Sequence, residues 1–106
     1  MKLERIKNVT RVERGVVEMK SYRWNGFHIP EHMMSGIKRY VEEGILPGHF
    51  LQAIISNDLF EACAKADDDS IRNLPAYVAY FYNETPMVCW GSKEKMLSWC
   101  KERRYR

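Results

Sequence analysis

The stretch from Gly44 to Leu59, GILPGHFLQAIISNDL, limits the fold more than any other part of the chain. Gly44 is a typical helix C-terminal residue, and Pro47 shortly after it prevents the helix from continuing. The Pro47-Gly48 turn leads into the most apolar run in the sequence. Its large apolar residues recur at helical spacing: Phe50, Leu51, Ile54 and Ile55. The pattern predicts a helix at the centre of the core.

The segment before this stretch predicts an amphipathic helix that begins near Pro30. Proline suits a first helical turn, and the carboxylate of Glu31 favours the positive end of a helix dipole. One face of this helix is apolar: Met33, Met34, Ile37, Tyr40 and Val41.

Three further helices are expected after the central one. Asp58 with Glu61 resembles a capping box, which predicts a short helix over 59–66. The run Asp67 to Ser70 predicts a loop and a cap for a helix that reaches Asn83, with Pro75 marking a kink or its true first turn. We expect Met87–Trp90 to be extended. Ser92 should then cap a final helix with its Met96, Leu97 and Cys100 side chains turned inward.

The N-terminal region favours strands. Residues 9–24 are rich in Val, Tyr and Trp, which fits two strands that meet near Arg14-Gly15 or one strand with a bulge. Asn25-Gly26 offers a different hairpin, which pairs residues 21–24 with 27–29. The sequence leaves these pairings open.

We predict a mainly α domain of about four to five helices with a short N-terminal β-hairpin or strand. Its parts are a basic, extended or β arm over 1–24 and a helical core over 25–106.

Charge is distributed unevenly along the 106 residues, whose formal net charge is +3. Residues 1–23 carry seven basic and three acidic side chains, and residues 93–106 carry six basic and two acidic ones, so each end has a charge of +4. The middle therefore has a charge of −5. Basic ends favour an acidic or polyanionic partner, although charged termini are also commonly just solvated.

Neither a catalytic motif nor a metal motif is present in the sequence. The chain lacks a nucleophile elbow, a phosphate-binding glycine loop, CxxC and HExxH. We therefore predict no enzymatic activity, no cofactor and no metal site. Cys89 fits a small buried hydrophobe better than a nucleophile. With an odd number of widely spaced cysteines and no apolar leader, the sequence predicts reduced thiols in a cytoplasmic protein without a membrane span.

Candidate binding residues fall into two groups. The first group interleaves cationic and aromatic side chains, as single-strand nucleic-acid binders do: Lys20, Tyr22, Arg23 and Trp24. Packing of Tyr22 and Trp24 on the sheet or helix face is the favoured explanation. The second group contains polar or aromatic residues beside apolar stretches: Arg39, His49, Asn57, Asp58, Asn83 and Trp90. Helix caps are the ordinary explanation for Asn57, Asp58 and Asn83.

The segment from Ile29 to Trp99 resembles a family of small uncharacterised proteins of tailed phages and prophages. The motifs that carry this resemblance are RYVEEGILPGHFLQAIISNDL, KADDD and YNETPMVCWGS. The resemblance implies action inside a bacterial host cell, and no reaction comes with it. We expect a non-catalytic binding protein that modulates a host or defence component through protein–protein contact, with a homo-oligomer as one arrangement. The alternatives are a nucleic-acid-binding accessory protein and a small-nucleotide or signal-molecule binder.

Overall fold

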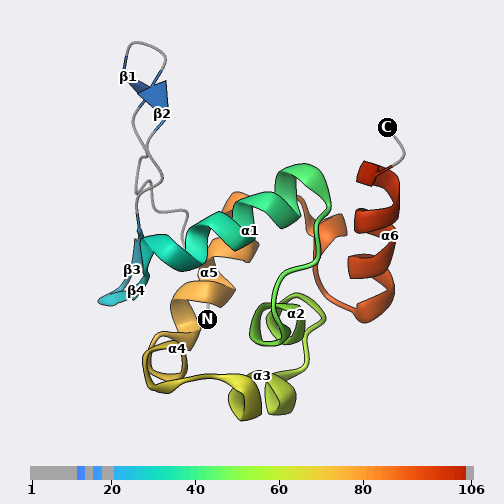
Figure 1. Cartoon of the computed structure of the whole chain (residues 1–106). Helices are drawn as coiled ribbons and strands as arrows, with labels where there is room; N and C mark the ends of the chain where they lie inside the picture. Colours follow the sequence, from blue (N-terminus) through green and yellow to red (C-terminus); the bar gives the residue numbers. More distant parts are fainter. Residues whose placement is uncertain (1–11, 14–15, 18–20, 105–106) are drawn as a thin grey trace.

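The computed structural model describes residues 12–13, 16–17 and 21–104 (Figure 1). Within them lie six α-helices, one 3-10 helix and two two-stranded antiparallel sheets. The mainly helical class with a short N-terminal hairpin is confirmed. The elements in chain order are β1 (Val12–Glu13), β2 (Val16–Val17), β3 (Tyr22–Trp24), β4 (Phe27–Ile29), α1 (Glu31–Glu43), α2 (His49–Ile55), α3 (Leu59–Lys65), α4 (Asp68–Arg72), α5 (Leu74–Glu84), η1 (Met87–Cys89) and α6 (Lys93–Arg104).

Both hairpins that the sequence left open are formed. β1 pairs with β2, and β3 pairs with β4 in a register that places Trp24 opposite Phe27. Asn25 and Gly26 connect the second pair with φ angles of 52° and 86°. Positive φ at both central residues is the requirement of a tight hairpin turn, which explains the Asn-Gly dipeptide.

The second hairpin belongs to the core. Tyr22 and Trp24 are only 4% and 7% exposed, and the Tyr22 ring packs edge-on against Tyr80 with 5.2 Å between centroids. The predicted division between residues 24 and 25 therefore cuts through a packed hairpin, and the core includes Tyr22–Trp24. The rest of the predicted arm, apart from β1, β2 and Ser21, lies outside the described residues.

α1 ends where expected. Gly44 has a φ of 71°, and its N–H donates to the Tyr40 carbonyl. The Trp99 indole on α6 donates to the Tyr40 and Val41 carbonyls at 3.1 and 3.2 Å. Carbonyls in the last turn of a helix can accept further hydrogen bonds, so this indole joins the end of α1 to α6.

The central position predicted for α2 is confirmed. Phe50, Leu51 and Ile55 are buried, and the Phe50 ring lies edge-on to Tyr77 at 5.0 Å. The Gly91 N–H donates to the Ile55 carbonyl at 2.8 Å. This bond connects the end of α2 to the segment that precedes α6.

Side-chain caps begin the next two helices. Asp58 accepts from the Glu61 N–H at the start of α3, and Asp67 accepts from the Ser70 N–H at the start of α4. The helix predicted to reach Asn83 is divided at Asn73, and Pro75 lies in the first turn of α5. This division accounts for six helices where four to five were expected.

Two expectations for the C-terminal region are wrong. Met87–Cys89 is a 3-10 helix and not extended. Leu97 is 45% exposed, whereas Met96, Trp99 and Cys100 are buried. Buried positions spaced by three and four residues define one helix face, and Leu97 lies off that face. Ser92 caps α6 as predicted, since its hydroxyl accepts from the Lys95 N–H.

No helix in the described ranges is both long enough and apolar enough to cross a membrane.

Candidate functional site: a groove between α1 and α2

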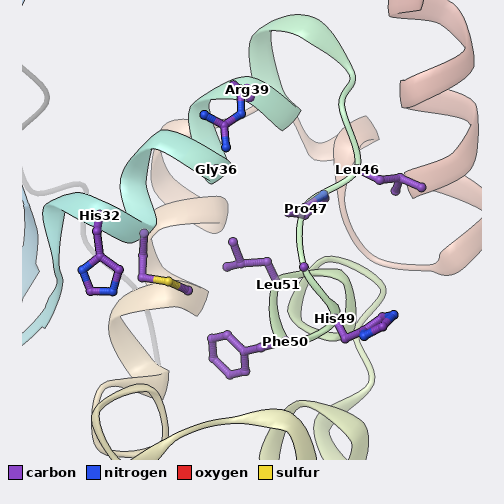
Figure 2. A pocket seen from close by; sticks show the side chains of 10 residues that line it. His32, Gly36, Arg39, Leu46, Pro47, His49, Phe50 and Leu51 are labelled. Carbon is purple, nitrogen blue, oxygen red and sulfur yellow. The ribbon is translucent and has the colours of Figure 1, made fainter.

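An open groove of about 390 Å³ lies between α1 and the segment that enters α2 (Figure 2). Its walls come from one face of α1 and from six consecutive residues, 46–51. Most of the lining residues are apolar, and three of them, His32, Arg39 and His49, carry side-chain nitrogens. The full lining is His32, Met33, Gly36, Arg39, Leu46, Pro47, Gly48, His49, Phe50 and Leu51. One wall of the groove therefore belongs to the stretch from Gly44 to Leu59.

Backbone geometry explains why a groove forms here. The left-handed conformation of Gly44 reverses the chain after α1, and the Gln52 side-chain amide donates to the Pro47 carbonyl at 2.7 Å. That bond holds the connecting segment against the start of α2. A Cβ built on Gly36 would lie 3.7 Å from the Leu51 side chain, so the absence of a side chain there leaves α1 open toward α2.

Arg39 is the cationic group of the groove. Its side chain extends from α1 over the space between the two helices, and the Leu51 and Phe50 side chains enter that space from α2 (Figure 2). Within the described part of the chain, the guanidinium has neither a hydrogen bond nor an ion pair. A guanidinium carries five donors in a planar fork, so this site can accept a carboxylate or a phosphate beside an apolar group.

The two imidazoles differ in position. His32 points down from the N-terminal half of α1, whereas the His49 ring points away from Arg39 on the far side of the connecting segment (Figure 2). The pKa of Asp67 is lowered mainly because its carboxylate accepts a hydrogen bond from the Ser70 N–H, and the charge of His32 lowers it further. The His32 end of the groove thus has an acidic neighbour, and Arg39 is the more available cation.

Scans against protein-family models, curated proteins and solved structures found no match to this chain. The resemblance to the phage family therefore rests on its motifs alone.

Of the predicted site residues that the structure describes, only Arg39 and His49 line the groove. Asn57, with a φ of 64°, and Asp58 form the turn and the cap between α2 and α3, which is the ordinary explanation given above. Both are exposed.

The remaining predicted residues lie elsewhere. Tyr22, Trp24 and Asn83 are buried, so their side chains are not available to a partner. Arg23 is exposed on β3, and Lys20 lies outside the described residues. Trp90 is partly buried, with its ring centroid 6.1 Å from that of Tyr82.

His32, Gly36 and the apolar lining were not predicted to be parts of one site. The signal was present, because positions 32, 36 and 39 are spaced by four and three residues and so share one helix face. What was not visible is that residues 46–51 return along that face.

Other groups with chemical potential are dispersed. Across the described ranges, no three or more His, Cys, Asp or Glu side chains gather as metal ligands. Cys63, Cys89 and Cys100 form no disulfide; Cys63 is exposed, and Cys89 and Cys100 are buried. Burial raises the pKa of the Cys89 thiol, which favours the small-hydrophobe interpretation over a nucleophile.

Proposed function

We propose that this chain is a non-catalytic binding protein whose groove receives an acidic, apolar segment of a partner protein. The observation that carries the proposal is Arg39, an exposed guanidinium without a partner among the described residues, set above the apolar side chains of Phe50 and Leu51. A carboxylate bound by Arg39 would orient the segment, and an apolar side chain next to it would fill the groove.

The resemblance to phage and prophage proteins extends the proposal to the cellular setting. Under it, the protein acts inside a bacterial cell and modulates a host or defence component by occupying a surface of that component. The partner's contact segment then carries Asp or Glu next to Leu, Phe or Trp.

A displayed library of random peptides tests the groove directly. We expect enrichment of sequences that combine a carboxylate with a large apolar residue. Affinity for the best synthetic peptide should fall about tenfold or more in Arg39→Gln, since a charge-assisted hydrogen bond contributes roughly 1.5–3 kcal/mol. Lys38→Gln is the matched control, because it removes the same charge from the adjacent position of α1. Lys38 forms an ion pair with Glu42 at 3.9 Å and does not line the groove.

Enrichment of basic peptides, or equal effects of the two substitutions, would contradict the proposal. A partner captured from bacterial lysate counts in favour only if Arg39→Gln releases it and Lys38→Gln retains it.

A small anionic ligand is the second candidate, favoured by the groove's volume. A volume of about 390 Å³ lies within the range of small-molecule sites, and Arg39 would bind a phosphate as readily as a carboxylate. Thermal-shift screening with linear and cyclic nucleotides separates the two candidates, because a tight ligand must raise the Tm of the wild type but not of Arg39→Gln.

A nucleic-acid partner is the third candidate, favoured by the exposed Lys93, Lys95 and Lys101 of α6. Phosphate contacts of this kind make affinity fall steeply with salt. DNA and RNA affinities measured at several salt concentrations test it, and affinity that is indifferent to salt would exclude it.

A further inference from the structure

An exposed aromatic residue on α3 lies outside the groove. Phe60 is 89% exposed and its neighbour Leu59 is 60% exposed, while only Ala62 of α3 is buried. A phenylalanine this exposed is costly to hydrate, and its burial in an interface would be favourable.

The residues around Leu59 and Phe60 are mainly acidic. Residues 58–72, the α3–α4 lobe, contain five carboxylates and two cations, a formal charge of −3. Both cations are engaged within the lobe, Lys65 with Glu61 at 3.9 Å and Arg72 with Asp69 at 3.2 Å. A surface that covers Phe60 should therefore carry positive charge around an apolar centre.

The outer face of α6 has that composition. Lys93, Leu97 and Lys101 follow one another at four-residue spacing, and all three are exposed. Leu97 is the residue whose predicted burial is wrong. Residues 93–104 carry five cations and two carboxylates, a formal charge of +3. Glu94 and Glu102 lie on the adjoining stripe, so the basic stripe is narrow.

We infer that the α3–α4 lobe of one copy of this chain binds the Lys93–Leu97–Lys101 face of α6 in a second copy. α3 and α6 both contact α2, with α3 below it and α6 to its right in Figure 1. A two-fold axis would form this contact twice, because each copy supplies both surfaces. The inference is independent of the groove, which lies between α1 and α2.

Sedimentation of the full chain over a wide concentration range tests the inference. We expect a reversible dimer that weakens several-fold at about 0.5 M salt, where exposed charges are strongly screened. Phe60→Ser should raise the dissociation constant of the dimer about tenfold or more, because a large apolar contact is lost. Val78→Ser, at a position 48% exposed on α5, is the matched control and should leave the constant within about twofold.

Reversing the charges of each surface in turn tests the pairing of the two surfaces more directly than Phe60→Ser does. One variant carries Lys93→Glu and Lys101→Glu, and the other carries Glu61→Lys and Asp68→Lys. Each alone should sediment as a monomer, because like charges then meet at both contacts. A mixture of the two should form a heterodimer, because both contacts regain opposite charges. Far-ultraviolet circular dichroism confirms that each variant is folded.

A wild-type chain that remains monomeric at every concentration would overturn the inference. So would equal effects of Phe60→Ser and Val78→Ser, or a mixture of charge variants that fails to associate. Arg39→Gln should still dimerise, so failure of the groove proposal and failure of this inference are distinguishable.

Discussion

The Tyr40 hydroxyl donates a 2.6 Å hydrogen bond to the Cys89 carbonyl, joining α1 to η1 across 49 residues. Tyr40 is fully buried, and its own carbonyl accepts from the Trp99 indole. One residue of α1 therefore connects η1 and α6 to the first helix.

Tyr40→Phe should lower the free energy of unfolding by about 1–3 kcal/mol, because the Cys89 carbonyl loses this buried donor. Denaturant unfolding measures the change. Tyr82→Phe is the control, since Tyr82 is 54% exposed, and it should have little effect. Equal losses in the two variants would contradict a structural role for the Tyr40 hydroxyl.

Gly44→Ala should destabilise the protein by more than the roughly 1 kcal/mol that a left-handed residue other than glycine costs. A Cβ at Gly44 would lie 2.6 Å from the Arg103 Cβ and 3.0 Å from the Cys100 carbonyl oxygen, so α6 would have to move. Gly26→Ala separates the two effects, because Gly26 also has positive φ but nothing lies within 4 Å. Thermal unfolding should rank the loss at Gly44 well above that at Gly26.

Stability should fall above pH 10 because of Tyr80. Burial, followed by the charges of Glu84 and Glu42, raises the pKa of Tyr80 to about 12. Between pH 10 and 12 the unfolded chain releases this proton while the folded chain keeps it. The contribution of Tyr80 to the free energy of unfolding is therefore fully present below pH 10 and declines through that interval. The loss amounts to at most about 3 kcal/mol.

Tyr80→Phe removes that titration and should flatten the decline in denaturant unfolding across the interval. A residual slope is expected from Tyr40, whose pKa is also raised by burial. A decline as steep in Tyr80→Phe as in the wild type would show that Tyr80 does not contribute.

Two N-terminal deletions of different length should differ in their effect on stability. Deletion of residues 1–20 leaves every buried core residue of the described chain in place, so the Tm should change little. Deletion of residues 1–24 also removes Tyr22 and Trp24, and losing two buried aromatic residues should cost several kcal/mol. Calorimetry of both chains measures this difference. Studies of partner binding by the basic arm should therefore use the shorter deletion.

Much of the local structure followed from the residues themselves. Gly44, Asp58 and Ser92 end or begin helices as predicted, because a left-handed glycine or a capping oxygen acts on backbone groups only a few positions away. The Asn25-Gly26 turn belongs to the same class of local effect. The site was predicted less completely: Arg39 and His49 were named, but His32 and the apolar lining were not.

Tertiary packing decided the rest, since helical spacing shows that a face exists but not what covers it. Leu97 and Val78 are apolar and at helical spacing, yet they face outward because the neighbouring Met96 and Tyr77 take the buried positions. The groove depends on the return of residues 46–51 along α1, and the exposure of α3 depends on Ala62 being its one buried residue. Such arrangements depend on contacts between segments far apart in the chain, which local propensity does not encode.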